Sequence, residues 1–473
     1  MSWLEACRVE GERAGLDPDW FEVLWAFGGE DAPGPADLDA PLPRESLPTA
    51  IEECLAREVD AGQAALFARR FHSVVGLLDG MGQPETTLLR VALFRRAAQI
   101  LAAPPPHARR IRALVDYIWS QAAVVRHRRP GAPRLEDLVG ELVLREVSPK
   151  VRHGRVQGLT DQGPVHINVL RVRSPRLRTM DARGGGGLVA LCAAHGAVAG
   201  VSGGFFLYSE PDIEAPSRRT DPVGWLVTDG QLVSPPVFGR TALVQEASGA
   251  LSIRTQDLSG VVLQIGTVVV APDTPRVHRA QAEVVSASEG GLVVAVVGHE
   301  VVGVSTTELS VPLAGFVLCL APGASVAVGD RVLYDLPAVA QAMAGGPLLL
   351  GEGALQLACE DFAGSAPPVT FSQDETFDRN LLPRMAAGLT GAGELVLAAV
   401  DGRNAERAPG LTLRRTGELM RALGCVRAMN LDGGSSKRMV VQGEVVDLPS
   451  TEVVGDRTAP ARVRPVHTAV LVL

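Results

Sequence analysis

The spacing of hydrophobic residues divides the chain into two parts with different patterns. Up to about residue 145, apolar residues recur every three or four positions, which predicts helices over residues 51–78, 88–102 and 108–125. Gly80 follows the first segment, and prolines at 104–106 separate the other two, because proline cannot continue a helix interior. We therefore expect a small all-α domain over residues 1–140, whose role the sequence leaves open.

After Lys150 the pattern changes to short β-branched runs between glycine or proline turns. Four such runs predict strands, at residues 165–172, 261–265, 291–297 and 395–400. One later segment keeps the helical spacing: Thr412 is expected to cap a helix over residues 413–423, and Gly424 to end it. The predicted fold is α+β, with a β-rich mixed domain of few helices over residues 150–473 and a β-rich insert region at 245–335.

Composition and charge exclude several classes of protein and of binding partner. Hydrophobic residues make up 46% of the 473 positions and charged residues 21%, which excludes a disordered chain or a coiled coil. The net charge of −8 provides no overall positive field, so we expect no nucleic acid partner. No uncharged apolar run reaches the roughly 18 residues of a membrane-spanning helix. The first ten residues contain two acidic side chains, Glu5 and Glu10, which is unlike a secretory signal. We therefore expect a cytoplasmic location and no membrane partner.

Three residue types deserve separate interpretation. The six cysteines are scattered without CxxC spacing, which favours reduced packing residues over disulfides or zinc ligands. Only Lys150 and Lys437 are lysines, so nearly all basic residues are arginine. For the scattered histidines we expect surface or satisfied-core positions rather than catalysis: His153, His166, His195, His278 and His299.

Four glycine-rich clusters in the second part of the chain carry the candidate chemistry. They lie at residues 202–206, 345–348, 384–388 with 401–403, and 430–436. Adjacent glycines let backbone N–H groups approach a ligand and form an anion-binding nest, while arginine binds phosphate in a bidentate manner. Taken singly, each cluster also has a structural interpretation: glycine pairs form turns, Phe205 and Phe206 join the core, and Arg384 makes a buried salt bridge.

In their order, the clusters resemble the phosphodiester glycosidase family, whose best-known member is the lysosomal uncovering enzyme. Its typical motifs are Asn-Gly/Ala-Gly-Phe-Phe, Gly-Gly-Pro-Leu, Arg-Thr-Ala-x-Gly, Asp-Gly-Arg and Asn-Leu-Asp-Gly-Gly-Gly-Ser. All five have counterparts in this order over residues 150–473, and the last two are the most specific. The chain departs from the family pattern at five positions: Ser202, Met385, Ser435, Lys437 and His467. The changes at Ser202 and Lys437 bear on the substrate more than on the reaction class.

The resemblance implies an enzyme that hydrolyses the glycosidic bond of a sugar 1-phosphodiester. The oxocarbenium-like transition state needs a carboxylate, while the phosphate leaving group needs charge neutralisation more than protonation. Asp432 is the first candidate for that carboxylate, Asp401 the second and Glu375 the third. Arg384 and Arg403 would neutralise the phosphate. Sugar hydroxyls or phosphate oxygens would be oriented by Asn430, Ser435 and Ser436.

The substrate is expected to bind along the glycine clusters, at Ser202, Gly203, Gly204, Phe205, Gly345, Gly346, Arg403, Gly433, Gly434, Ser435 and Ser436. The chemistry requires no cofactor; a divalent cation near Asp401 and Asp432 is compatible with it, although no ligand spacing demands one. The expected partner is a small-molecule or glycan phosphodiester. Two alternatives stay open: a non-catalytic module that binds phosphorylated sugar or polysaccharide, and an effector domain that the helical N-terminus recruits to a protein partner.

Overall fold

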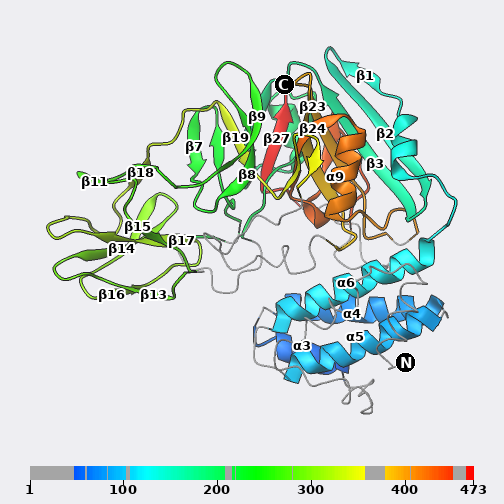
Figure 1. Ribbon diagram of the computed structural model, residues 1–473, viewed down its shortest axis with the longest axis horizontal. Coiled ribbons are helices and arrows are strands. Elements are labelled where there is room, and N and C mark those ends of the chain that lie inside the picture. Colours follow the sequence, from blue (N-terminus) through cyan, green and yellow to red (C-terminus); the bar gives the residue numbers. More distant parts are fainter. Residues whose placement is uncertain are drawn as a thin grey trace.

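The chain folds into a helical bundle, a β-rich body and a smaller lobe of strands, which occupy different regions of the ribbon in Figure 1. The several sheets and few helices outside the bundle confirm the predicted α+β fold with its helical N-terminal region. None of the described helices combines the length and apolar character needed to cross a membrane. The computed structural model describes residues 47–58, 61–81, 84–102, 107–207, 216–218, 220–279, 281–356, 379–404, 406–450 and 465–473.

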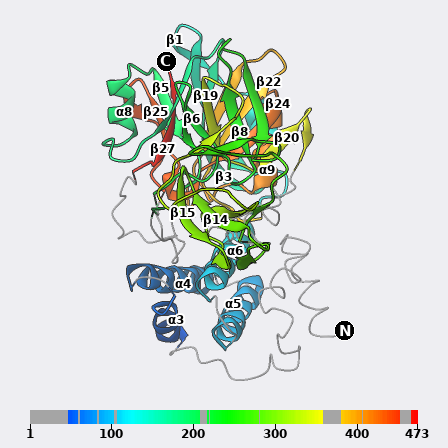
Figure 2. The ribbon, with the colours of Figure 1, turned by 90° about the vertical axis from the view of Figure 1, so that its left-hand side faces the viewer.

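The helical bundle buries its apolar residues in a core of its own, which includes Ile51, Phe71 and Trp119. Leu381, which precedes the sheet strand β22, also packs into this core, and its backbone N–H donates to Ser120 Oγ at 2.8 Å. The bundle lies below the strands in Figure 2. Its helices are α3 (Leu47–Leu55), α4 (Ala61–Met81), α5 (Pro84–Ala102) and α6 (His107–His127).

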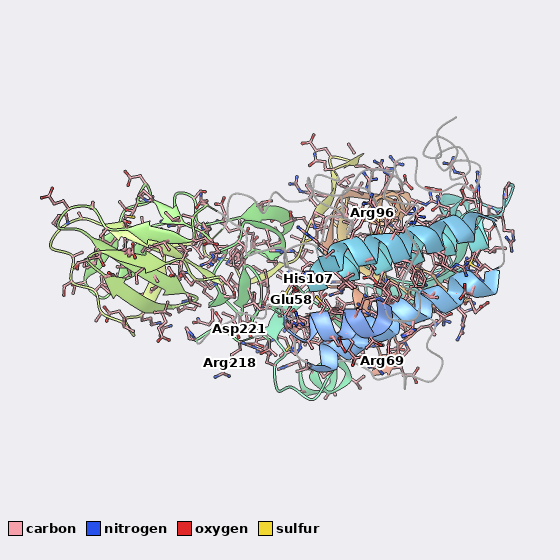
Figure 3. All side chains as sticks on the ribbon, turned by 90° about the horizontal axis from the view of Figure 1, so that it is seen from below. Glu58, Arg69, Arg96, His107, Arg218 and Asp221 are labelled. Carbon is pink, nitrogen blue, oxygen red and sulfur yellow. The ribbon has the colours of Figure 1, made fainter. Side chains whose placement is uncertain are left out.

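The prediction of one helix over residues 51–78 is wrong, because the chain turns between α3 and α4. Glu58 lies in that turn, and its carboxylate accepts hydrogen bonds from the backbone N–H of His107 at 2.7 and 2.9 Å. Figure 3 shows Glu58 beside His107, the first residue of α6. A carboxylate placed there satisfies a donor that α6 cannot satisfy itself. The other two predicted helices are confirmed as α5 and α6.

An antiparallel sheet of eight strands forms the centre of the β-rich body. Successive residues along each strand point to opposite faces, so the sheet contributes to two cores. The strands predicted at 165–172 and 395–400 are confirmed as β3 and β23, which are direct neighbours. In sheet order the strands are β1 (Arg145–Ser148), β2 (Val151–Thr160), β3 (Gly163–Val172), β23 (Leu395–Val400), β22 (Arg384–Thr390), β24 (Cys425–Leu431), β20 (Leu348–Gly351) and β21 (Ala354–Leu355).

Helix α9 (Leu413–Ala422) covers one face of this sheet, where it contacts β20, β22 and β24, and α7 (Leu135–Gly140) lies beside it. Its predicted ends are confirmed. Thr412 Oγ1 accepts a hydrogen bond from the backbone N–H of Arg415 at 3.2 Å, and Gly424 follows the helix with φ +85°. This helix therefore fixes the approach to β24, the strand that leads into the last motif cluster.

Two five-stranded antiparallel sheets pack against the other face of the central sheet, and all three share one core. Helix α8 (Leu188–Ala194) packs on the first of them. In order, that sheet contains β26 (Glu444–Val445), β25 (Met439–Val441), β5 (Ala199–Ser202), β27 (Thr468–Val472) and β4 (Leu177–Asp181). The second contains β7 (Gln231–Ser234), β6 (Leu226–Thr228), β19 (Gln341–Ala344), β8 (Arg240–Gln245) and β9 (Leu251–Gln256).

The lobe of strands interrupts this second sheet, because its residues lie between β9 and β19, which both pair with β8. It includes the strands predicted at 261–265 and 291–297, which are confirmed as β10 and β14. Its three small sheets comprise β11 (Val268–Val270), β10 (Leu263–Ile265) and β18 (Val332–Tyr334); β12 (Arg276–Val277), β17 (Gly315–Leu320), β14 (Leu292–Val297) and β15 (Glu300–Ser305); and β13 (Val284–Ser286) with β16 (Glu308–Ser310).

Candidate active site

The motif clusters of the second part meet at one edge of the central sheet. Strand β22 begins at Arg384, where its antiparallel neighbours β23 and β24 end: Arg384 pairs with Val400, and Met385 pairs with Leu431. Asp401 and Asp432 directly follow these neighbouring strands. Strand β20 begins at this edge too, so the Gly345–Pro347 turn before it reaches the same place. Segments far apart in sequence thus present their polar residues together.

Backbone contacts lock the first cluster to the last. The backbone N–H of Asp432 donates to the carbonyl of Gly203 at 2.9 Å. Ser202 Oγ donates to the carbonyl of Asp432 and accepts from the backbone N–H of Arg438, both at 3.3 Å. A Cβ atom at Gly204 would collide with the carbonyl oxygen of Ala344, so only glycine fits. The Ser202 hydroxyl therefore fixes both ends of the loop that follows Asp432.

The structure places Arg384 and Asp401 on opposite faces of the sheet. Ala386 and Ala398 contribute to the core under α9, whereas Met385 and Leu397 contribute to the core shared with the five-stranded sheets. By this alternation Arg384 points to the α9 side and Asp401 to the other side. The two residues therefore do not act on one substrate atom as a pair.

Arg384 is buried and holds together two neighbouring segments. Its Nε donates to the carbonyl of Leu411 at 3.0 Å, and its Nη2 donates to the carbonyl of Asn380 at 2.8 Å. These bonds tie the segment before α9 to the segment before β22. These bonds give Arg384 a structural role, and the buried salt bridge expected for it stays a prediction.

Asn430 shares the face of Arg384, because it pairs with Ala386 across β24 and β22. Its Nδ2 donates to the carbonyl of Gly346 at 3.1 Å, and the backbone N–H of Gly346 donates to the carbonyl of Asn430 at 2.7 Å. Its Oδ1 is buried and makes no hydrogen bond within the described residues. Since a buried acceptor without a partner is costly, Oδ1 is suited to accept from a bound hydroxyl.

Asp401 lies in a buried network of charges. Its carboxylate accepts hydrogen bonds from His166 Nδ1, from Lys437 Nζ, and from the backbone N–H of Leu448 at 3.1 and 3.2 Å. Lys437 also donates to Asp447 Oδ2 at 2.7 Å. The side chains of Lys437 and Asp447 are fully buried, and that of Asp401 is 1% exposed. The Lys437 ammonium thus lies between two carboxylates, where a metal ion would otherwise be attracted.

The environment of Asp401 favours its charged form. Burial alone would raise its pKa, but the hydrogen bond from His166 and the positive charge of Lys437 outweigh burial and hold the pKa below its usual value. A carboxylate that is ionised and fully paired is a weak nucleophile and a weak base. Asp401 is therefore better suited to holding Lys437 and His166 in place than to attacking a substrate.

The sequence indicated Lys437 as unusual and predicted a surface or satisfied-core position for His166. The structure shows that His166 is buried and hydrogen-bonded. The sequence patterns did not indicate Asp447, which lies in no motif. Asp447 Oδ1 also accepts from the backbone N–H of Met439 at 2.6 Å, so this residue fixes the start of β25. In the sequence, the one signal that connects Asp447 to the motif cluster is its position ten residues after Lys437.

Arg403 lies beside the loop that follows Asp432. A Cβ atom at Gly434 would be 3.8 Å from both terminal nitrogens of the Arg403 guanidinium, and Gly434 has φ +55°. Arg403 itself adopts φ +59°, a left-handed conformation that costs a non-glycine residue about 1 kcal/mol. Such conformations cluster at functional sites. Asp432 is 9% exposed, so a carboxylate-bearing loop and a cation share this corner of the sheet edge.

The remaining predicted residues are placed as follows. Ser435 and Ser436 lie in the short helix η2 (Gly434–Ser436) and are buried. Phe205 is buried in the core with the Arg240 guanidinium 4.8 Å from its ring centre. Glu375 lies outside the described residues. Among the described residues, no group of three or more His, Cys, Asp or Glu side chains is arranged to hold a metal ion.

Comparison with known proteins supports the predicted resemblance. A family model for phosphodiester glycosidase matches residues 282–473, which confirms the resemblance for that part of the chain and includes three of the four clusters. The first cluster, at 202–206, lies before the match. No curated protein matches the sequence.

Solved structures with partial similarity to this chain include the following. A hypothetical protein from Synechocystis is 18% identical with a TM-score of 0.46; the match covers 70% of this chain and 63% of that protein. A putative exported protein from Burkholderia pseudomallei is 23% identical with a TM-score of 0.43, covering 67% and 75%. The catalytic domain of zebrafish N-acetylglucosamine-1-phosphodiester alpha-N-acetylglucosaminidase, auto-inhibited by its pro-peptide, is 13% identical with a TM-score of 0.42, covering 73% and 96%.

Proposed function

We propose, from the phosphodiester glycosidase domain that residues 282–473 carry, that this chain hydrolyses the glycosidic bond of a sugar 1-phosphodiester. One observation carries the proposal: the loop that bears Asp432 lies against the Arg403 guanidinium at the sheet edge where the motif clusters meet. A carboxylate and a fixed cation are the two groups that this reaction needs. The sugar and the group on the far side of the phosphate stay open.

Asp432 is the carboxylate of this mechanism. It either takes a proton from a water molecule whose oxygen bonds to the anomeric carbon, or it attacks that carbon itself and forms an ester that water then hydrolyses. The bond between that carbon and the phosphate oxygen breaks, and its electron pair leaves with the phosphate monoester. Asp401 does not compete for this role, because its carboxylate already accepts hydrogen bonds from Lys437 and His166.

Arg403 neutralises the charge that develops on the leaving phosphate, so little protonation by an acid is needed. Arg384 serves as a positioning residue, since its bonds to two backbone carbonyls fix the sheet edge. Asn430 accepts from a sugar hydroxyl through Oδ1, which has no hydrogen-bond partner among the described residues. No step of this mechanism requires a metal ion or another cofactor.

The test measures sugar release from a panel of sugar 1-phosphodiesters, with nucleoside diphosphate sugars and simple alkyl phosphodiesters as its two classes. We expect turnover of at least one class and a loss of a hundredfold or more in Asp432→Asn. Asp273→Asn makes the same change at an exposed aspartate of the lobe and should keep full activity. A folded Asp432→Asn variant with normal turnover would remove Asp432 from the mechanism.

A second candidate function is a non-catalytic module that binds phosphorylated sugars. The ion pair between Lys437 and Asp401 favours it, because this lysine stands where the family commonly has small hydroxyl residues. Saturable binding of the same panel without release of sugar would support the binding module over the hydrolase.

A further inference from the structure

The segment before β22 joins the helical bundle to the edge of the central sheet where the motif clusters meet. Two consecutive side chains of this segment enter different cores. Leu381 is 5% exposed and packs into the core of the bundle, whereas Leu382 packs against the core under α9. The segment is therefore held from both sides, and it cannot shift without disturbing one core or the other.

Ser120 of α6 makes the polar part of this attachment. Its Oγ donates to the carbonyl of Asp116 at 2.8 Å within the helix and accepts from the backbone N–H of Leu381 at 2.8 Å. Ser120 and Leu381 are both buried, so removal of the hydroxyl would leave the Leu381 N–H without an acceptor. The serine therefore fixes the backbone of the segment, while the leucine side chain anchors it in the core.

Pro383 packs against both loops that carry the candidate carboxylate and the candidate cation. Its carbonyl accepts a hydrogen bond from the backbone N–H of Gly434 at 2.9 Å. A Cβ atom at Gly433 would lie 2.4 Å from that carbonyl oxygen, and one at Gly402 would lie 2.5 Å from the Pro383 nitrogen. Both loops approach the Pro383 backbone so closely that only glycine fits, and their positions therefore depend on that of Pro383.

A second contact reaches the same place from the end of α6. Arg126 Nη2 donates to Glu406 Oε1, in the loop that begins with Arg403. The two side chains are 34% and 53% exposed, so water and salt weaken this ion pair. We therefore assign the attachment mainly to Ser120 and Leu381.

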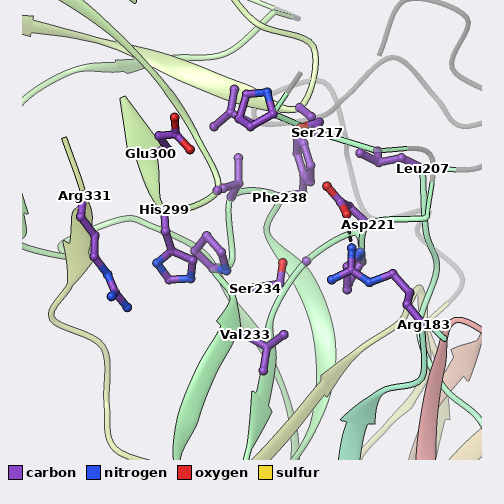
Figure 4. Close-up of a pocket in the computed structure, with 18 of the residues that line it drawn as sticks. Arg183, Leu207, Ser217, Asp221, Val233, Ser234, Phe238, His299, Glu300 and Arg331 are labelled. Carbon is purple, nitrogen blue, oxygen red and sulfur yellow. Dashed lines mark hydrogen bonds and ion pairs between the residues drawn. The ribbon is translucent and has the colours of Figure 1, made fainter. Parts of the chain in front are cut away.

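Among the described residues, none from the bundle lines the cavity of about 430 Å³ that Figure 4 shows. That cavity lies between the lobe, which supplies His299 and Glu300, and the body, which supplies Ser234 and Asp221. The bundle instead contacts the backbone that carries the candidate site. Its effect is therefore expected on the position of the reacting groups rather than on the shape of this cavity.

We propose that Ser120 is a positioning residue of the candidate active site. Through Leu381 and Pro383, the bundle holds both loops of that site in place. The coupling stands on these contacts alone, whereas its importance for catalysis rests on the proposed function. Because a misplacement of about 1 Å can cost a reaction much of its rate, a loosened link should slow the chemical step more than it weakens substrate binding.

The first test measures hydrogen exchange of backbone amides in the full chain, which needs no substrate. Ser120→Ala removes the acceptor of the Leu381 N–H, so the amides of Leu381 and Gly434 should exchange about tenfold faster or more. Leu381→Ala keeps that acceptor but removes the anchor from the bundle core, and it should have the same effect on Gly434.

Val74→Ala is the control for both variants. It removes buried volume from α4 and leaves the hydrogen bond between Ser120 and Leu381 in place, so Gly434 should exchange as in the unmodified chain. Unchanged exchange at Gly434 in both link variants would overturn the proposal. So would equal acceleration in Val74→Ala, because the loop would then respond to the stability of the bundle as a whole.

The second test uses the sugar 1-phosphodiester that the unmodified chain turns over fastest. Ser120→Ala should lower kcat about tenfold or more with little change in KM, and Val74→Ala should keep both values. Normal kcat in Ser120→Ala despite fast exchange at Gly434 would overturn the positioning role. If the unmodified chain turns over no diester, the proposed function fails, while the exchange rates still decide whether the bundle holds the two loops.

Discussion

The buried ammonium group of Lys437 is bound to the carboxylate of Asp401, a residue 36 positions earlier in the chain. Each charge would be expensive to bury alone, and the pair persists because every partner around it is itself hydrogen-bonded. Lys437 is thereby a structural cation at the end of the most specific motif. Its pairing with Asp401 is the reason why the proposed function assigns the chemistry to Asp432.

We expect Lys437→Met to destabilise the fold by about 3–5 kcal/mol, because it leaves a buried carboxylate on Asp401 without its main cation. Urea unfolding at neutral pH measures the change. Lys150→Met is a matched control, since the only other lysine of the chain is exposed. Equal stability of the two variants would contradict the structural role assigned to Lys437.

Stability should also fall in acid through Asp401. Its pKa in the folded chain is below its value in the unfolded chain, which is about 3.9, so its contribution is complete above that value. The contribution is lost as pH falls through the lower folded pKa. Between pH 2 and 6, the free energy of unfolding should fall less steeply with decreasing pH in Asp401→Asn than in the unmodified chain. The exposed control Asp273→Asn should keep the steep pH dependence of the unmodified chain. The same pH dependence in all three proteins would refute the assignment.

If the proposed function holds, Arg403→Gln should lower kcat/KM for phosphodiester hydrolysis by about a hundredfold to a thousandfold, because it removes the cation proposed to neutralise the leaving phosphate. The effect should appear mostly in kcat, since the charge develops in the transition state. Arg407→Gln changes an exposed arginine of the same loop and should behave like the unmodified chain. A purely structural role for Arg403 would instead lower the melting temperature and leave kcat per folded molecule intact.

Gly204→Ala should cost about 1–3 kcal/mol and reduce activity, because the added methyl group collides with the backbone of Ala344. The carbonyl it meets belongs to β19 and cannot rotate away as a side chain would. Gly76→Ala, inside α4, adds a methyl group into open space and should be neutral or stabilising. Thermal unfolding of both variants checks the contrast; similar melting temperatures would show that the two segments can separate.

Local patterns predicted what depends on local chemistry. The caps of α9, the strands β3 and β23 and the order of the motif clusters follow from residues close together in the chain. The break between α3 and α4 does not follow from nearby residues, because Glu58 in that break bonds to the start of α6, 49 positions later. Similarly, strand alternation separates Arg384 from Asp401, but this could be read only once the register of β22 and β23 was known.

The placement of Asp447 was out of reach for the same physical reason. Its partners are Lys437, Arg438 and the backbone of Met439, and it joins them only because β25 and β26 form a hairpin. A motif records which residues are near one another in sequence. A buried charge network is decided by which strands pair, so its members need no common spacing.

The neighbours of the last strands set a limit on how the chain can be divided. Strand β23 pairs with β3, β25 pairs with β5, and β27 pairs with both β4 and β5, all of which precede residue 282. A fragment that begins there would leave these strands with unpaired edges and would lack the hydroxyl of Ser202 that holds the Asp432 loop. The segment recognised as the family domain is therefore not an autonomous folding unit; any expressed version must retain the strands that precede it.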